Sequence, residues 1–340
     1  MMLTEGLFDL QVNGYAGVDF NDLAITAERL DEALEAMRLD GVSGCLPTLI
    51  SATPAELEAR FRALDAAVSA SRLGPSMVPG YHLEGPFLNP AEGYRGCHPA
   101  EAMSDPDLAL VHRLDELLER PILLLTLAPE RDGALQAIER LRASGKTIAI
   151  AHSAAGFETV RRAADAGMSL STHLGNGLPP CLHKVDNTVL AQLAEPRLAA
   201  CLIADGHHLS PDTLRALVTL KGRERCVLVS DAVLAAAAGP GDYRFAGMQV
   251  SRGADGAVRV PGASSLAGSA LCLDQAIRNV CDWSIATFEE AVAMASSRPR
   301  ALLAPALEHH AITLEAGSVR WNSALEPQPR SDGAVERREG

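Results

Sequence analysis

The chain repeats one pattern eight times: a short apolar run that ends in polar residues, followed in most cases by a longer stretch with helical spacing. The apolar runs are residues 6–14, 41–50, 77–85, 122–130, 147–153, 168–176, 199–208 and 226–233. The helical stretches are residues 25–40, 53–70, 105–120, 132–145, 156–167 and 210–222. Strands that alternate with helices predict a parallel sheet, and eight such units favour a closed barrel over a doubly wound sheet. We therefore predict an α/β fold, a TIM-like (β/α)₈ barrel.

Composition agrees with one large core and excludes several classes of partner. The 340 residues are 47% hydrophobic and 4% aromatic, which excludes global disorder and predicts a core of Ala, Val, Leu and Ile. Acidic residues outnumber basic ones 43 to 30, and the net charge is −13. Nucleic acids and anionic membranes both need a basic surface, so neither is expected as the main partner.

The cysteines and the N-terminal residues predict a cytoplasmic protein. Seven cysteines stand far apart with no C-x-x-C pair, which favours reduced thiols over a disulfide framework or a zinc finger. The first residues lack a basic stretch followed by a long apolar run, so no signal peptide is expected. No run of about 18 apolar residues occurs, so no membrane helix is expected.

The barrel pattern leaves three segments to be placed. Residues 1–322 are expected to form the barrel domain, with a small hairpin insertion at about 239–262. Two further helices are expected at 267–282 and 287–303. The polar, Pro- and Gly-rich segment 323–340 is expected to be a disordered tail.

Polar side chains that end the apolar runs predict a site at one mouth of the barrel. They are Gln11, Asn13, His82, Glu84, His152, His173, Asp205, His207, His208 and Asp231. In a (β/α)₈ barrel the C-terminal ends of all strands meet at one face, where active sites lie. One carboxylate with two imidazoles is the ligand set of many catalytic zinc sites. A carboxylate at the last strand could take a proton from water and pass it to a leaving amine.

Ten blocks of residues follow one another in a fixed order along the chain. The blocks are DLQVNGYAGVDFND, GVSGCLPTLI, HLEGPFLNP, RGCHP, TLAPE, AHSAA, THLGNGLPP, IADGHHL, LVSDA and SLAGSALCLDQAIRN. Together they resemble the N-acetylglucosamine-6-phosphate deacetylase family of the amidohydrolase superfamily. They run in family order from residue 9 to about residue 280. Any single block would be a weak signal, whereas ten in order are specific.

The resemblance implies a metal centre and a catalytic acid–base group. Glu84, His152 and His173 match the metal ligands of the family, and Asp231 matches its catalytic aspartate, the general base and acid. Gln11 and Asn13 stand where many amidohydrolases carry two histidines, as vestiges of a second metal position. Neutral amides are poor ligands, so we predict one divalent ion: zinc first, with iron, manganese or cobalt as alternatives.

The resemblance also implies a set of substrate contacts and a homodimer. The contacts are Cys97, His98, Asn176, Gly177, Lys184, His208, Leu266, Ala267 and Gly268. Lys184 replaces an arginine that grips the substrate phosphate in relatives, often across a dimer interface. Lysine binds phosphate as a point charge without the two-pronged guanidinium fork. The accessory β-sandwich of the family is expected to be reduced or absent, because few residues flank the barrel.

The implied activity is metal-dependent removal of acetate from an N-acetylated amino sugar. N-acetylglucosamine 6-phosphate, giving glucosamine 6-phosphate and acetate, is the first choice of substrate. The altered block around Asn176 and Gly177, together with Lys184, keeps an unphosphorylated or differently substituted N-acyl sugar, or a cyclic amide, as the alternative. A catalytically dead sugar-binding barrel is a third hypothesis, and it would require loss of a metal ligand or of Asp231.

Overall fold

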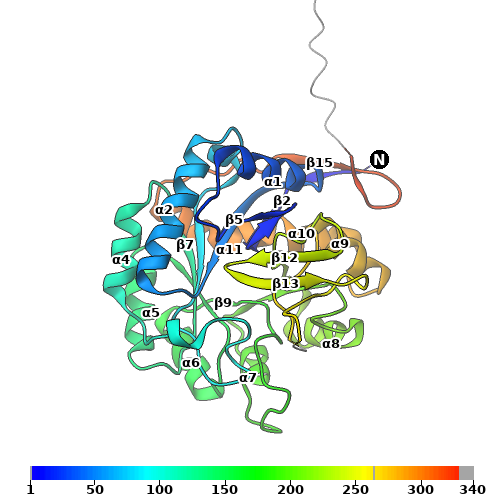
Figure 1. Cartoon of the computed structure of the whole chain (residues 1–340). Helices are drawn as coiled ribbons and strands as arrows, with labels where there is room; N and C mark the ends of the chain where they lie inside the picture. The colour runs from blue at the N-terminus through cyan, green and yellow to red at the C-terminus, as the bar shows by residue number, and fades with distance from the viewer. Residues whose placement is uncertain (1, 263–264, 329–340) are drawn as a thin grey trace, which may run out of the picture.

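Eight parallel strands form a barrel in the computed structural model, which describes residues 2–262 and 265–328 (Figure 1). Their order in the sheet is β11-β10-β9-β8-β7-β6-β5-β2. The strands are β2 (Leu7–Val12), β5 (Val42–Ile50), β6 (Tyr81–Glu84), β7 (Ile122–Leu127), β8 (Thr147–Ile150), β9 (Leu170–Ser171), β10 (Ala199–Leu202) and β11 (Cys226–Leu228). Each falls within one of the eight apolar runs, and the predicted TIM-like barrel is confirmed.

The barrel closes through the segment that follows β11. Asp231 N donates to Gln11 O at 3.0 Å, and Asn13 N donates to Ala232 O at 2.7 Å. Ser230 N donates to Asp9 Oδ1 at 3.2 Å. These bonds bring the first and last strands of the barrel together.

Helices surround the sheet (Figure 1). They are α1 (Ala27–Leu39), α2 (Pro54–Ala70), α3 (Gly74–Met77), α4 (Leu108–Leu117), α5 (Ala134–Ala143), α6 (Phe157–Ala166), α7 (Thr188–Ala194), α8 (Pro211–Lys221), α9 (Leu273–Asp282), α10 (Phe288–Ala295) and α11 (Ser297–His309), with 3₁₀ turns at Ala100–Ala102 and Arg223–Arg225. Thr53 and Glu56 form a capping box at the start of α2. No described helix is both long and apolar enough to cross a bilayer.

The helices differ from the expected ones in several places. α3 and α7 lie outside every stretch that was predicted to be helical. Residues 267–272 are not helical, because Ser269 N donates to Asp231 O at 2.9 Å and ties this segment to the barrel mouth. The helix expected at 287–303 is two helices, because Ser296 adopts φ −133° and ψ −82° and interrupts the helical path.

Short antiparallel sheets lie outside the barrel. β12 (Gly241–Phe245), β13 (Met248–Arg252) and β14 (Val258–Arg259) occupy the expected insertion, where we expected two strands and find three. They pack on a small core that includes Ile50, Val233 and Phe245. β3 (Gly14–Tyr15) pairs with β4 (Val18–Asp19).

The two ends of the described chain meet in a third small sheet. It joins β1 (Met2–Glu5), β15 (Ser318–Trp321) and β16 (Pro327–Gln328). Residues 323–328 are therefore a turn and a strand and not part of a disordered tail, because β16 pairs with β15. Residues 329–340, for which we also expected disorder, lie outside the described residues.

Asp9 is a buried carboxyl at the seam where the barrel closes. Only 1% of the residue is exposed. Its Oδ1 accepts from the backbone nitrogens of Gln11, at 3.3 Å, and Ser230, at 3.2 Å. Burial raises the pKa of Asp9 from 3.8 to about 7. Because the folded chain disfavours the ionised form, this group lowers the stability of the fold as pH rises from 3.8 towards 7.

We expect Asp9→Asn to become more stable relative to the natural chain as pH rises. The amide oxygen keeps the acceptor role, while the group no longer ionises. The difference in free energy of unfolding, measured by urea denaturation, should favour the variant more at about pH 8 than at about pH 5. Asp132→Asn, at an exposed position, is the control and should show no such trend. A difference that does not change with pH would contradict the assignment.

Candidate metal centre and active site

The side chains predicted as metal ligands meet around one carboxylate oxygen. Glu84 ends β6, while His152 and His173 follow β8 and β9. Glu84 Oε1 lies 2.8 Å from His173 Nε2 and 3.4 Å from His152 Nε2. All three residues are buried. The structure therefore brings together the three residues on which the sequence-based hypothesis depends.

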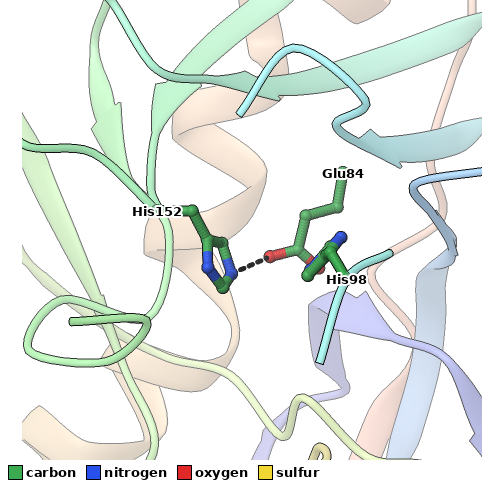
Figure 2. Close-up of side chains that lie close together, drawn as sticks. All are labelled: Glu84, His98 and His152. Atoms are coloured by element: carbon green, nitrogen blue, oxygen red, sulfur yellow. Dashed lines mark ion pairs between the residues drawn. The ribbon is translucent and has the colours of Figure 1, made fainter. Parts of the chain in front are cut away.

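His98 joins this group from the loop after β6. Figure 2 shows Glu84, His98 and His152 pointing toward one another. One ligand atom from each of these three residues lies within 4.8 Å of the others. The ring centroids of His98 and His152 are 4.6 Å apart, and those of His152 and His173 are 4.9 Å apart. His98, expected only to contact substrate, thus borders the candidate metal position directly.

Left-handed backbone at three positions turns these side chains into the mouth. His152, His173 and Asp231 have φ values of 49°, 30° and 47°, a region that residues other than glycine rarely adopt. Such conformations cost free energy and cluster at functional sites. Gly177 lies against the His152 ring, where an added Cβ would stand 2.4 Å from Nδ1. Glycine at that position allows the chain to approach the ring.

The hydrogen bonds of His152 leave its Nε2 free to bind a cation. Its Nδ1 lies 2.6 Å from the carbonyl oxygen of Tyr94. A carbonyl can only accept, so Nδ1 carries the hydrogen, and Nε2 of the neutral ring holds a lone pair that faces Glu84. A lone pair beside a carboxylate oxygen is unfavourable unless a cation or a proton lies between them. This arrangement fits a divalent metal ion.

Buried polar atoms without partners also surround the site. Among the described residues, they include Gln11 Oε1, Asn13 Oδ1 and His173 Nδ1. The amide nitrogens of the first two are used: Gln11 donates to Glu84 Oε2 at 3.1 Å, and Asn13 donates to Asp231 Oδ1 at 2.8 Å. Buried groups of this kind are normally satisfied. The unpaired atoms therefore indicate that the site receives a ligand.

The ionisable groups of the site differ in the direction in which their surroundings shift their pKa values. Burial raises the pKa of Glu84, but the close contacts with His152 and His173 outweigh burial and hold the pKa well below its ordinary value. Burial and the nearby His152 lower the pKa of His98 to about 3, so its ring is neutral. Burial and the Glu84 charge raise the pKa of Asp231 to about 6. A carboxyl group with a pKa near neutrality suits general acid–base catalysis.

A cavity of about 250 Å³ opens above these groups. The expected substrate contacts that line it are Cys97, His98, Asn176, Gly177, His208, Leu266 and Gly268. Ala267 is fully buried and does not line the cavity, because its side chain packs into the small core beneath β12–β14. Lys184 is exposed and also lies outside the lining. None of the described lining residues is Lys or Arg.

Sequence reasoning assigned no role to several residues that orient the site. Asp205 Oδ2 lies 2.6 Å from His208 Nδ1, and Ser51 Oγ lies 2.9 Å from His98 Nδ1. Phe245 reaches the cavity from β12. The three-residue spacing of Asp205 and His208 on one turn could have indicated their pairing. Ser51 and Phe245 come from distant segments, and no local pattern marks them.

Comparison with known proteins identifies relatives along most of the chain. No family model matches it. It is 35% identical over 303 residues to the N-acetylgalactosamine-6-phosphate deacetylase of Escherichia coli O157:H7, covering 89% of this chain and 78% of that protein. It is 32% identical over 334 residues to the N-acetylglucosamine-6-phosphate deacetylase of Bos taurus, covering 93% and 78%.

Solved structures show the same fold. The N-acetyl-D-glucosamine-6-phosphate deacetylase of Mycobacterium smegmatis superposes with a TM-score of 0.84 at 28% identity, covering 96% of this chain and 85% of that chain. An aspartate-to-alanine mutant of that enzyme, in complex with N-acetyl-D-glucosamine-6-phosphate, gives the same TM-score. The Thermotoga maritima N-acetylglucosamine-6-phosphate deacetylase gives 0.81 at 25% identity, covering 96% and 85%.

We expect Glu84→Gln to lose about one equivalent of divalent metal per chain, because a neutral amide is a far weaker ligand than a carboxylate. Elemental analysis of the purified natural chain and the variant measures the difference. Glu119→Gln, at an exposed position, is the matched control and should keep the natural metal content. Equal metal content in all three proteins would show that Glu84 holds no ion.

Proposed function

The chain belongs to the family of N-acetylglucosamine- and N-acetylgalactosamine-6-phosphate deacetylases, and on that premise we propose a metal-dependent hydrolase that removes the N-acetyl group of an amino sugar 6-phosphate. The first-choice reaction converts N-acetylglucosamine 6-phosphate and water to glucosamine 6-phosphate and acetate. The observation that carries the proposal is the convergence of Glu84, His152 and His173 within one cavity that Asp231 also lines. No metal ligand or catalytic aspartate is replaced, which argues against a dead sugar-binding barrel.

Glu84, His152 and His173 would hold one divalent cation, with zinc first and iron, manganese or cobalt as alternatives. Such a cation, when bound, polarises a carbonyl oxygen and lowers the pKa of water. Glu84 supplies the charge, since its pKa lies well below the ordinary value. Tyr94 O fixes the His152 ring so that Nε2 faces the cation position.

Asp231 moves the proton in this mechanism. Its Oδ1 is held by Asn13 Nδ2 at 2.8 Å. The carboxylate takes a proton from the attacking water, the water oxygen bonds to the acetyl carbon, and the carboxyl then gives the proton to the departing nitrogen. The carbon–nitrogen bond breaks, which leaves the free amine and acetic acid, and the acid releases its remaining proton to give acetate. Because its pKa is raised to about 6, Asp231 can perform both transfers near neutral pH.

Two histidines would orient the substrate. Ser51 Oγ can donate to His98 Nδ1, which leaves Nε2–H of the neutral ring to donate to the acetyl oxygen. A well-placed donor to a developing oxyanion contributes about 3 to 4 kcal/mol. Asp205 accepts from His208 Nδ1, so His208 Nε2 can accept a hydrogen bond from a sugar hydroxyl.

N-acetylgalactosamine 6-phosphate, which differs from the first-choice substrate at the 4-hydroxyl, is a second candidate substrate. The relatives at 35% and 34% identity from Escherichia coli O157:H7 and Shewanella are named N-acetylgalactosamine-6-phosphate deacetylases. Several relatives at 29–34% identity carry the glucosamine name. Residues that contact the 4-hydroxyl would decide between the two. An unphosphorylated N-acyl sugar remains the alternative, because no described lining residue is Lys or Arg.

We expect deacetylation of N-acetylglucosamine 6-phosphate or N-acetylgalactosamine 6-phosphate, with the unphosphorylated sugars far poorer. Acetate release from all four compounds, measured as kcat/KM on metal-assayed protein, tests this. The ratio between the two phosphates assigns the epimer. A preference for a neutral sugar would contradict the phosphorylated substrate, and no release from any of the four would contradict the deacetylase.

The Asp231→Asn variant, measured in the same acetate-release assay, tests the catalytic role of Asp231. The variant should bind metal normally, because Asp231 is not among the proposed ligands, and should lose about a hundredfold or more in kcat, since general acid–base groups typically contribute 10²–10⁴-fold. Turnover close to that of the natural chain would remove Asp231 as the proton carrier.

A homodimer would supply the charge that the cavity lacks. Lys184 is exposed on the segment between β9 and α7, and Asn176 and Gly177, earlier in the same segment, line the cavity. Val185 is 60% exposed beside it, which is a large exposure for an apolar side chain. We place Lys184 at a dimer contact, where it would face the phosphate bound by the partner.

Lys184→Ala should raise KM for the sugar phosphate about tenfold, equivalent to about 1.4 kcal/mol, and leave KM for the unphosphorylated sugar unchanged. Light scattering of the natural chain should give the mass of two chains. Arg72→Ala, at an exposed ion pair, is the control and should change neither quantity. A monomer, or an unchanged KM for the phosphate, would contradict this role.

All seven cysteines are free thiols in the described structure. Free thiols persist where the surroundings are reducing. A cytoplasmic location therefore belongs to the proposal.

A further inference from the structure

Three potential metal ligands gather at a second place in the fold. Asp40 caps the C-terminal end of α1, Cys272 directly precedes α9, and Asp274 lies in the first turn of α9. One ligand atom from each, two carboxylate oxygens and Cys272 Sγ, lies within 4.8 Å of the others. None of the three lines the catalytic cavity. We call them the α1–α9 cluster.

Asp274 has one buried carboxylate oxygen that lacks a hydrogen-bond partner. Its side chain is only 7% exposed. Oδ2 pairs with Arg278 Nη1 at 2.7 Å, while Oδ1 is buried and has no hydrogen-bond partner. A buried carboxylate oxygen without a partner is costly, and a bound cation would satisfy it. This observation is independent of the spacing of the three ligands.

The neighbours of the cluster are themselves held by hydrogen bonds and an ion pair. The Tyr15 hydroxyl donates to Asp40 Oδ2 at 2.5 Å, which orients that carboxylate without adding charge. Arg278 pairs with Asp274. Arg252 also lines the cavity beside the cluster, and its guanidinium donates to the carbonyl oxygens of Ala235 and Ala238. A cavity of about 350 Å³, lined by the three residues of the cluster, gives an ion room to enter.

We propose that the α1–α9 cluster binds a divalent transition-metal ion, zinc or cobalt, held by Asp40, Cys272 and Asp274. A thiolate with carboxylate oxygens suits zinc or cobalt, whereas magnesium and calcium prefer oxygen alone. The thiol must release its proton on binding, since burial and Asp40 raise the pKa of Cys272 to about 12 in the metal-free chain. The ion would join the end of α1 to the start of α9.

Cobalt binding to the full chain tests this site separately from the catalytic one. The metal-stripped natural chain should take up about two cobalt ions, with a sulfur-to-cobalt charge-transfer band in the near ultraviolet. Cys272→Ser should bind about one ion and lose the band, and Glu84→Gln should bind about one and keep it. Cys281→Ser, also on α9, is the matched control and should behave as the natural chain does.

Two outcomes would overturn the proposal. These are a natural chain that binds cobalt without the charge-transfer band, and a Cys272→Ser variant that keeps two ions and the band. Should Cys272→Ser fail to fold, alkylation of the natural chain provides the second measurement. Zinc should then protect Cys272, relative to Cys281, from iodoacetamide as read by mass spectrometry. Equal labelling with zinc and with chelator would also overturn it.

Discussion

The hydrogen bonds that close the barrel determine the geometry of the catalytic site. Asp231 N donates to Gln11 O and Asn13 N donates to Ala232 O, so the first and last strands share one seam. The same residues then reach into the site: Gln11 binds Glu84, and Asn13 binds Asp231. The amide side chains of Gln11, in β2, and Asn13, just after it, thus connect the barrel seam to the carboxylate proposed to hold the metal and to the carboxylate proposed to move the proton.

A layer of hydrogen-bonded side chains within the barrel supports the metal position. His82, two residues before Glu84, lies 3.1 Å from Thr48 Oγ1 and 2.8 Å from Thr126 Oγ1. Thr126 in turn lies 2.8 Å from Thr172, the residue before His173. Burial lowers the pKa of His82 to about 4, so its ring stays neutral and can donate on one side and accept on the other. A buried network in which the polar groups are hydrogen-bonded makes the strands rigid. Rigid strands can support the strained backbone of the candidate ligands His152 and His173.

Local periodicity predicted the barrel and the mouth at which polar strand ends meet, and the family resemblance then indicated which of those residues are the candidate ligands. Glu84, His152 and Asp231 are adjacent to strand ends, and a parallel barrel brings all strand ends to one mouth. Pattern failed where a contact between distant segments decided the outcome. Residues 267–272 read as helical, yet Ser269 bonds to the Asp231 backbone. Ala267 read as a substrate contact, yet its side chain fills the small core under β12–β14, which also includes Ile50 from the distant end of β5.

The amino-acid sequence by itself determined the eight strand–helix units, the identity of the candidate ligands and the family resemblance, since each depends on residue type and order along the chain. Only the tertiary structure decided how the ligands face one another. The left-handed backbone at His152 and His173, the Tyr94 carbonyl that orients one ring and the Asp205 carboxylate that orients His208 all depend on how loops pack. The α1–α9 cluster has the same origin, because Asp40 and Cys272 are neighbours only after the helices assemble around the barrel.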